Sequence, residues 1–249
     1  MVNNLNVLIL GGSNGVGKYL AKEFVKKGAN VALVARRKNR LTKIINDLNK
    51  IKKGNIFFAK NLIPEGNPQK ILKNLIKKKG IPDIVINCVG GGLGISDPFA
   101  KYNDWKKVWR FNAGIAIEIN SYLLPFYQKR RKIGKILHIS SLSSIHNNFQ
   151  HDKIAYSTSK TFLNAYVKNL ANFKKVKNCF LYVFLPGPIN VEGKYWHKQY
   201  LKNKKNVQIY MKKNFKIGRL LNVEEVGSKI AKVALQKNPI KTGSLIFFK

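Results

Sequence analysis

Short apolar runs alternate along the chain with longer segments in which apolar residues recur at helical spacing. The runs, such as residues 5–10 and 30–35, have the length and the Val, Leu and Ile content of buried strands. The longer segments have the period of helices that bury one face. Helices are predicted over Gly15 to Lys27, Leu41 to Ile51, Gln69 to Lys78, Asp104 to Gln128, Ala155 to Phe173 and Val223 to Leu235.

This alternation predicts a parallel sheet with helices on both faces, because each parallel connection must cross over the sheet. We therefore expect an α/β fold, a doubly wound Rossmann-type sheet of about seven strands. No Gly/Ser-rich or Pro-rich linker divides residues 1–249, so a single domain is expected. The polar, aromatic and lysine-rich stretch 193–214 is either a lid over a pocket or an ordinary helical insertion.

The charge of the chain is extreme, with 47 Lys and Arg against 11 Asp and Glu and a formal net charge of +36. Such a charge creates a positive field that attracts acidic partners, nucleic acid among them. The basic residues are scattered over nearly every expected helix and loop, without a nucleic-acid motif or a basic stripe. Lys, Asn, Ile, Phe and Tyr share A/T-rich codons, so biased gene composition explains much of the charge and nucleic-acid binding is not expected.

The positions of the cysteines and histidines indicate the cellular compartment of the protein and whether it binds a metal ion. Cys88 and Cys179 lie in apolar strand-like runs, where reduced core thiols and hence a cytoplasmic setting are expected. The apolar run near the amino terminus is too short for a signal peptide core or a membrane span. The histidines at 138, 146, 151 and 197 have no metal-like spacing, and no metal site is predicted. Only His197, beside Tyr195 and Trp196, is a candidate for substrate contact.

A glycine turn follows the first apolar run and leads directly into a helical pattern. A strand, a tight turn and a helix N-terminus bring backbone N–H groups and the positive end of a helix dipole against a pyrophosphate. The spacing G-x-x-x-G-x-G differs from the more familiar G-x-G-x-x-G, so the turn alone only suggests nucleotide binding. Its residues are Gly11, Gly12, Ser13, Asn14, Gly15, Val16 and Gly17.

The end of the second apolar run indicates which dinucleotide would bind. It ends at Ala35, where an acidic residue would accept the ribose hydroxyls of NAD, and Arg36 and Arg37 follow. Guanidinium groups hold a 2′-phosphate with forked hydrogen bonds. The missing carboxylate and the arginine pair predict a preference for NADP(H) over NAD(H), although an arginine pair also arises by chance in so basic a chain.

Tyr156 and Lys160 are four residues apart on an expected helix and therefore share one face. A tyrosine with a pKa near 10 is a poor proton donor at neutral pH. A nearby ammonium and a cationic nicotinamide ring favour the phenolate and lower that pKa. The preceding strand-like run, KILHISSLSS, delivers several serine hydroxyls to the same end of the sheet.

Together these residues resemble the short-chain dehydrogenase/reductase family over residues 5–248. The glycine turn resembles the family's cofactor loop, and Tyr156 with Lys160 resembles its Y-x-x-x-K pair. The remaining matches are Asn87 to Gly90 for the N-N-A-G segment, Asn61-Leu62 for the Asp-Val that flanks adenine, Asn112 for the helix-four asparagine, and Pro186, Gly187, Pro188 and Ile189 for the turn at the nicotinamide.

The resemblance implies a role for each matching residue. Tyr156 protonates the substrate oxygen, Lys160 binds the nicotinamide ribose and depresses the tyrosine pKa, and Asn112 orders a water relay. The serine that contacts the carbonyl is expected to be Ser141, with an insertion in the loop that follows it. Ser143 is the alternative, because it has the family's usual separation from the tyrosine.

Two departures from the family pattern change what is expected. Val191 stands where a threonine often contacts the carboxamide, so Asn190 is the alternative donor or the contact is lost. The sequence KTGSLIFFK stops before the family's usual Asp-Gly-Gly tail, which weakens the expectation of a tetramer built with it. A homodimer or homotetramer remains the expectation.

The leading hypothesis is an NADPH-dependent reduction of a ketone, or the reverse oxidation. The pattern most resembles 3-oxoacyl-carrier-protein reductases, and a basic rim suits an acidic carrier protein. A sugar or another polar ketone is the alternative substrate. A nucleic-acid-binding protein and a cofactor-binding regulator without catalysis are less favoured hypotheses from other classes.

Overall fold

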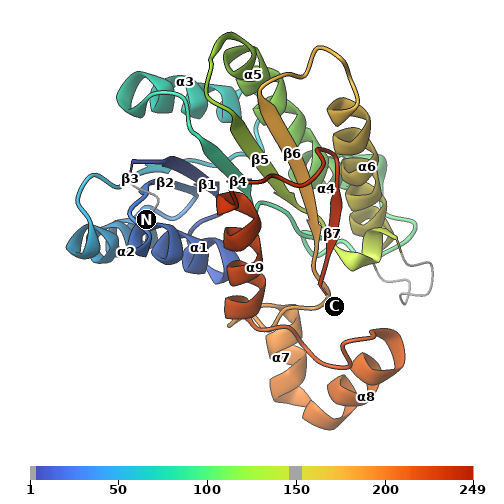
Figure 1. The fold of residues 1–249 in the computed structure, drawn as a ribbon. Helices are drawn as coiled ribbons and strands as arrows, with labels where there is room; N and C mark the ends of the chain where they lie inside the picture. Colours follow the sequence, from blue (N-terminus) through green and yellow to red (C-terminus); the bar gives the residue numbers. More distant parts are fainter. Residues whose placement is uncertain (1–3, 146–152, 249) are drawn as a thin grey trace.

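A seven-stranded parallel sheet forms the centre of the protein (Figure 1). The computed structural model describes residues 4–145 and 153–248. The strand order is β3-β2-β1-β4-β5-β6-β7, and every neighbouring pair is parallel. The strands are β1 (Asn6–Leu10), β2 (Asn30–Ala35), β3 (Ile56–Ala59), β4 (Ile84–Asn87), β5 (Gly134–Ile139), β6 (Cys179–Leu185) and β7 (Leu245–Phe247).

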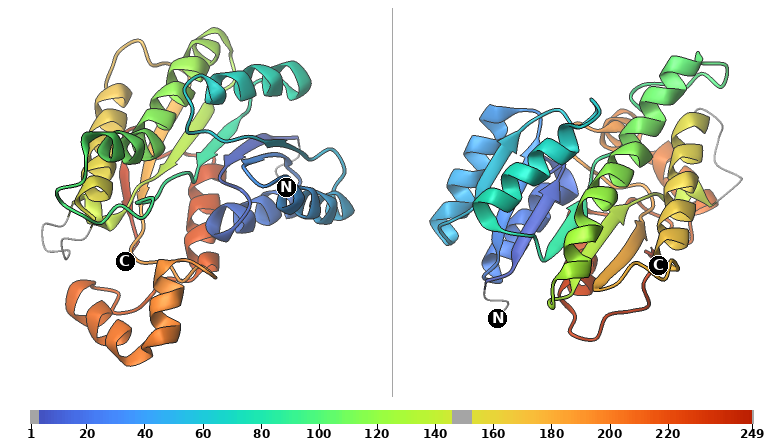
Figure 2. Two further views of the ribbon diagram at one scale, coloured as in Figure 1. Left: turned by 180° about the vertical axis from the view of Figure 1, so that it is seen from behind. Right: turned by 90° about the horizontal axis from the view of Figure 1, so that it is seen from above.

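Helices cover both faces of this sheet, as Figures 1 and 2 show. Apolar side chains from each layer form a separate core against one face of the strands. One layer consists of α1 (Gly15–Lys26), α2 (Lys38–Ile51) and α9 (Val223–Leu235). The other consists of α3 (Asn67–Lys79), α5 (Ile115–Lys129) and α6 (Ile154–Ala171), with α4 (Tyr102–Trp109) packed on α6. The predicted doubly wound α/β fold is confirmed.

The strand order reverses direction at β1, which lies between β2 and β4. Connections on the two sides of such a point diverge and leave a crevice at the carboxyl ends of the strands. The segments that the sequence singled out follow the carboxyl ends of four strands: the glycine turn follows β1, residues 88–90 follow β4, the serines follow β5 and residues 186–189 follow β6. The fold therefore brings them to one edge of the sheet.

Two features differ from the sequence-based expectations, and a third segment, left open there, is helical. The helix predicted over Asp104 to Gln128 is interrupted by a π-helical turn, η1 (Arg110–Gly114), between α4 and α5. Cys88 lies just beyond β4 instead of within it, although both cysteines are free thiols. The 193–214 stretch forms two helices, α7 (Tyr195–Lys202) and α8 (Lys204–Asn214), which project from the sheet domain (Figure 1).

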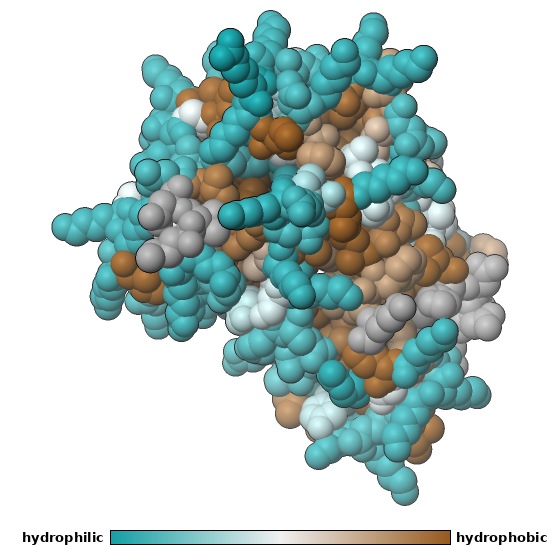
Figure 3. All heavy atoms as spheres, in the orientation of Figure 1, coloured by the Kyte–Doolittle hydropathy of each residue, from teal (hydrophilic) through white to brown (hydrophobic). Residues whose placement is uncertain are grey.

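Hydrophilic side chains occur around all sides of the face drawn in Figure 3, with areas of hydrophobic surface between them. They do not gather into one stripe on that face, in keeping with lysines scattered along the sequence. Across the described ranges, no helix combines the length and the apolar character needed to cross a membrane.

Candidate active site

A cavity of about 1310 Å³ lies between the carboxyl edge of the sheet and the α7–α8 segment. One wall comes from the ends of β4, β5 and β6 and from the first turns of α6, and the opposite wall from α7 and α8. The residues on the sheet side include Cys88, Gly90, Ser141, Ser143, Tyr156, Lys160, Pro186, Gly187 and Ile189. The cavity is large enough for a nucleotide end together with a substrate.

Ser141, Tyr156 and Lys160 meet on one wall of this cavity. The Ser141 hydroxyl interacts with the Tyr156 phenol and lowers its pKa. Lys160 Nζ lies 5.9 Å from the centroid of the Tyr156 ring and donates a hydrogen bond of 2.6 Å to the Ile139 carbonyl. The i, i+4 spacing on α6 thus aims both side chains at the carboxyl end of β5.

Ser143 also lines the cavity and lies next to Ser141, within the 3₁₀ turn η2 (Leu142–Ser144). The Ser143 hydroxyl donates to Ser141 Oγ at 2.9 Å, and its backbone N–H donates to the same oxygen at 3.2 Å. The hydroxyl proton of Ser141 is therefore left to face Tyr156. The insertion expected between these serines and α6 falls partly on residues 146–152, outside the described residues, as do His146 and His151.

Asn112 lies in the π turn and is held on several sides. Its Nδ2 donates to the carbonyls of Gly91 and Val108, at 2.9 and 2.8 Å, and its Oδ1 accepts from Gly91 N at 2.9 Å. Gly90 lies between Asn112 and Lys160, because a Cβ there would lie 2.7 Å from both Oδ1 and Nζ. The absence of a side chain at residue 90 is what lets the helix asparagine approach the lysine.

Burial dominates the electrostatics of the cavity wall. It lowers the pKa of Lys160 to about 7, and it raises the pKa of Tyr156, which the hydrogen bond with Ser141 partly offsets. The direction for the tyrosine is opposite to the sequence-based expectation, because loss of water around the phenolate outweighs the other influences. Burial also raises the pKa of the neighbouring Cys88 thiol to about 12, so this cysteine is an unreactive lining group.

The lowered pKa of Lys160 predicts a pH dependence of stability. Between pH 7 and pH 9 the unfolded chain holds the lysine proton more firmly than the folded chain, so stability rises with pH. We expect the free energy of unfolding to rise by about 1 kcal/mol per pH unit more in the parent than in Lys160→Met. Urea unfolding at pH 7, 8 and 9 measures this, and equal slopes in the two proteins would contradict it.

The glycine turn has the geometry of a phosphate cradle. Asn14 Oδ1 caps α1 by accepting from Gly15 N at 2.8 Å, so the helix begins at the turn. A Cβ on Gly17 would lie 2.5 Å from the Gly11 carbonyl oxygen, which shows how closely the turn and the helix pack. The N–H groups of Gly11 and Gly15 are used within the protein, by the Val34 carbonyl and by Asn14 Oδ1, so a pyrophosphate would be held by the N–H groups of Val16 and Gly17 at the helix N-terminus, with Ser13 in the turn before them.

The residues expected at the adenosine end lie around the ends of β2 and β3. Arg36 and Arg37 are exposed, and Arg37 is the residue that precedes α2. The Leu62 side chain is buried in the core, so only its backbone faces the loop surface. Asn61 Oδ1 accepts from Ile63 N at 3.2 Å and thereby shapes its own loop.

The residues expected at the nicotinamide end follow β6. The Pro186 carbonyl accepts from Leu142 N at 2.9 Å, which ties this turn to the serine turn. The Val191 side chain packs against Gly15, where an added Cβ would meet Cγ1 at 2.9 Å. Asn190, the alternative donor to a carboxamide, bonds His197 Nδ1 through its Oδ1 at 3.0 Å.

The sequence did not indicate several residues of the site. Leu142, Lys153, Gln199, Asn206, Val207, Tyr210 and Phe215 also line the cavity. Trp196 stacks on Tyr210 with ring centroids 5.6 Å apart, and Lys153 Nζ lies 3.5 Å from the centroid of the Tyr195 ring. The aromatic content of 193–214 was the available signal, but which rings would meet depends on how α7 packs on α8.

A buried polar chain continues beneath the site. His138, expected as a simple strand residue, contacts Asn87 Nδ2 through Nδ1 at 3.4 Å and Asn120 Oδ1 through Nε2 at 3.2 Å. Burial and the Lys160 charge lower its pKa to about 3, so the imidazole is neutral at physiological pH. Asn87 Oδ1 in turn accepts from Val89 N at 3.2 Å and orders the loop that carries Gly90.

The amino-acid sequence of the chain is similar to those of known dehydrogenases and reductases. A model of the short chain dehydrogenase family matches residues 5–199. The 3-dehydrosphinganine reductase of Danio rerio is 27% identical over 201 residues, which are 77% of this chain and 58% of that protein. The 11-beta-hydroxysteroid dehydrogenase-like 2 of Arabidopsis thaliana is 31% identical over 141 residues, 56% of this chain and 45% of that protein. The chain thus spans about half the length of these curated relatives.

Solved structures show the same fold. L-sorbose reductase from Gluconobacter frateurii, complexed with NADPH and L-sorbose, superposes with a TM-score of 0.88 at 22% identity, covering 99% of this chain and 95% of that one. A 3-oxoacyl (acyl-carrier-protein) reductase from Agrobacterium tumefaciens, with NADP bound, has a TM-score of 0.85 at 17% identity, with coverage of 99% and 93%.

The strand order and the helices on both faces of the sheet define a Rossmann-type fold. Since the family match covers most of the chain, the protein belongs to the short-chain dehydrogenase family of oxidoreductases.

Proposed function

We propose that the protein is an NADPH-dependent oxidoreductase that reduces a ketone to a secondary alcohol or runs the reverse oxidation. One observation carries the proposal: Ser141, Tyr156 and Lys160 line one wall of a single large cavity, and the Ser141 hydroxyl lowers the pKa of the Tyr156 phenol. The bound nicotinamide supplies the hydride. The side chains of the protein supply the proton and hold the carbonyl group.

Each side chain has a distinct part in this reaction. Tyr156 protonates the carbonyl oxygen, and Ser141 donates a hydrogen bond to the same oxygen, with Ser143 holding Ser141 in position. Lys160 holds the nicotinamide ribose, and its positive charge favours the phenolate form of Tyr156. Asn112 orders a water relay to solvent, a role supported by its Oδ1, which lies beside the same face of Gly90 as Lys160 Nζ.

The proposed preference for NADPH rests on Arg36 and Arg37, which are exposed at the end of β2. Residue 35, where an acidic side chain would accept the ribose hydroxyls of NAD, is an alanine. Replacement of both arginines by Ala removes two forked donors for a 2′-phosphate. We expect kcat/KM with NADPH to fall by about a hundredfold and kcat/KM with NADH to change by less than about threefold. Steady-state rates with both cofactors measure this. Equal rates of the parent with NADH and NADPH would overturn the preference.

The cavity lining bears on the substrate. Leu142, Trp196, Val207, Tyr210 and Phe215 give its α7–α8 side an apolar wall, which supports an acyl chain such as that of a 3-oxoacyl thioester. Gln199 and Asn206 add amide groups that suit a sugar or another polar ketone, which is the second candidate. The segment 193–214 is proposed as a lid, because both α7 and α8 contribute to this wall.

The test is a panel of acetoacetyl thioesters, sugar ketones and simple diketones, followed by NADPH absorbance. Faster turnover of the thioesters supports the first candidate, and faster turnover of the sugar ketones supports the second. No turnover of any ketone, together with salt-sensitive binding to duplex DNA, would favour a nucleic-acid-binding protein instead. Cofactor binding without turnover would favour a regulator.

We also propose that the protein forms a homodimer or homotetramer. Trp109 on α4 and Phe162 on α6 are partly exposed, and their ring centroids are 5.6 Å apart in an edge contact. Phe162 also stacks near Tyr166, at 6.4 Å. An aromatic face of this kind supports self-association, because such rings are enriched at protein interfaces.

A further inference from the structure

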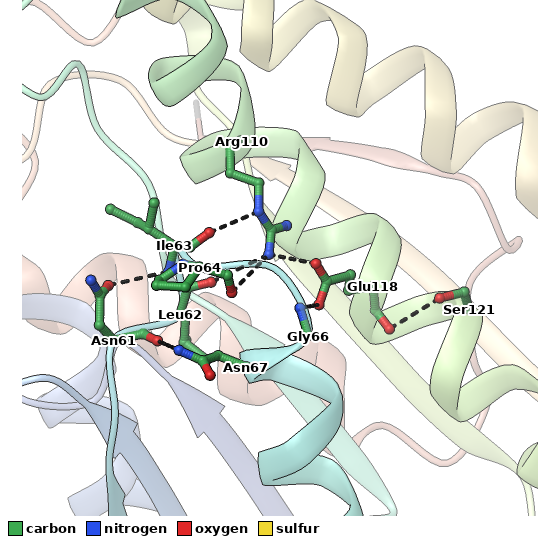
Figure 4. A network of polar contacts seen from close by, with 9 residues as sticks. All are labelled: Asn61, Leu62, Ile63, Pro64, Gly66, Asn67, Arg110, Glu118 and Ser121. Atoms are coloured by element: carbon green, nitrogen blue, oxygen red, sulfur yellow. Dashed lines mark hydrogen bonds and ion pairs between the residues drawn. The ribbon is translucent and has the colours of Figure 1, made fainter. Parts of the chain in front are cut away.

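Arg110, the first residue of the π turn, is buried, with 7% of the residue exposed, and it is not one of the residues that line the cavity. Its Nε donates to the Ile63 carbonyl at 2.9 Å, and its Nη2 approaches the carbonyls of Leu62 and Pro64 at 3.4 Å each. Figure 4 shows the guanidinium reaching across to these carbonyls. One side chain of the α4–α5 helix pair thus holds the backbone of a loop about 47 residues away in sequence.

Glu118 completes the arrangement from the first turn of α5. Its Oε1 lies 2.5 Å from Arg110 Nη2, and its Oε2 accepts from the backbone N–H of Gly66 at 3.1 Å. The carboxylate both neutralises the buried guanidinium and binds the far end of the same loop. We refer to Arg110 and Glu118 together as the loop clamp.

The clamped segment, residues 61–66, connects the carboxyl end of β3 to α3. Asn61 and Leu62 within it are the residues matched to the adenine-flanking pair of the family. Because the Leu62 side chain is buried in the core, what this segment offers to a ligand is its backbone and Asn61. The position of that backbone is fixed by the loop clamp and by the Asn67 amide, which donates to the Asn61 carbonyl at 2.8 Å.

Arg110 also lies close in sequence to Asn112, a residue proposed to take part in catalysis. Arg110 is two residues before Asn112 in the same π turn, and the space beside Gly90 that a Cβ would fill is bounded by both Asn112 Oδ1 and Lys160 Nζ. We propose that Arg110 and Glu118 are positioning residues that set the adenosine-end loop of the cofactor site relative to the helix that carries Asn112. This inference rests on the proposed function, because it assigns the loop to the cofactor.

Residue 110 must be an arginine to bond all the hydrogen-bond acceptors that surround its side chain. Three loop carbonyls and a carboxylate lie around the guanidinium, which offers five N–H donors in a fixed plane, whereas a lysine ammonium cannot span them. The exposed pair Lys107–Asp104 on α4, at 3.1 Å, makes no contact of this kind and is a matched control.

The paired variant Arg110→Met with Glu118→Leu tests the proposal. It removes both ends of the clamp while keeping apolar volume, and such a replacement of a buried ion pair often preserves folding. We expect the affinity for 2′,5′-ADP, measured by calorimetry, to fall about tenfold, with NMNH affinity within about twofold of the parent. Correspondingly, KM for NADPH rises about tenfold with kcat nearly unchanged. Lys107→Met leaves all four values at those of the parent.

The other possible results of this experiment also decide whether Arg110 and Glu118 position the loop. Parent-like 2′,5′-ADP affinity in the paired variant, or equal losses for both fragments, overturns the positioning role. If the paired variant does not fold, Arg110→Lys decides, since it keeps the charge and loses the fork: a selective loss for 2′,5′-ADP supports the role, and parent-like affinity overturns it. A parent that binds neither fragment would refute the proposed function itself, and the inference with it.

Discussion

Tyr156→Phe is expected to lower kcat for ketone reduction by about a thousandfold, because it removes the only atom proposed to deliver a proton to the carbonyl oxygen. The ring that lines the cavity is retained, so NADPH should bind with nearly parental affinity. NADPH oxidation with a ketone active in the parent measures the first effect, and fluorescence titration of NADPH measures the second.

Tyr102→Phe provides the control for this substitution. That tyrosine is 78% exposed at the start of α4, and loss of its hydroxyl should leave both measurements at parental values. If kcat of Tyr156→Phe lies within about tenfold of the parent value, another group donates the proton, and the proposed mechanism is wrong.

Gly90→Ala is expected to lower kcat/KM by about a hundredfold, an effect typical of catalytic groups displaced by about 1 Å. A Cβ at this residue would lie 2.7 Å from both Asn112 Oδ1 and Lys160 Nζ. Both groups must therefore move, and the hydrogen bonds that hold them to Gly91 and Ile139 must lengthen. Steady-state kinetics measures the loss, and thermal unfolding checks that the fold persists.

Gly92→Ala is the matched control two residues away. Its Cβ would meet its nearest neighbour, the Tyr156 Cβ, at an ordinary 3.8 Å, so activity should remain within about twofold of the parent. A Gly90→Ala protein as active as Gly92→Ala would show that the close approach of Asn112 and Lys160 has no part in catalysis.

Most of the fold could be predicted from the sequence because its signals are local. The alternation of apolar runs with helical periods depends on residues within about ten positions of one another. The helix ends were predicted to within a few residues, as with α1, which ends at Lys26. The π turn was not predicted, since apolar residues on both sides continue a helical period and its extra residue leaves no local mark.

The candidate site was partly predictable for the same reason. Tyr156 and Lys160 share a helix face by their spacing, and the cradle of Gly11 to Gly17 is a property of one turn. The relation of Ser141 to Ser143 needed coordinates, because it depends on which hydroxyl the η2 turn directs toward another element. The direction of the Tyr156 pKa also needed coordinates, since burial cannot be counted from sequence.

The sequence by itself determined the class of fold, the glycine turn before α1 and the Tyr156/Lys160 pair, because each follows from neighbours along the chain. Only the tertiary structure decided the contacts between distant segments: the stacking of α7 on α8 over the cavity, the approach of Gly90 to Asn112 and Lys160, and the loop clamp of Arg110 and Glu118. Such contacts join residues tens of positions apart, and they exist only once the sheet and its helices have packed.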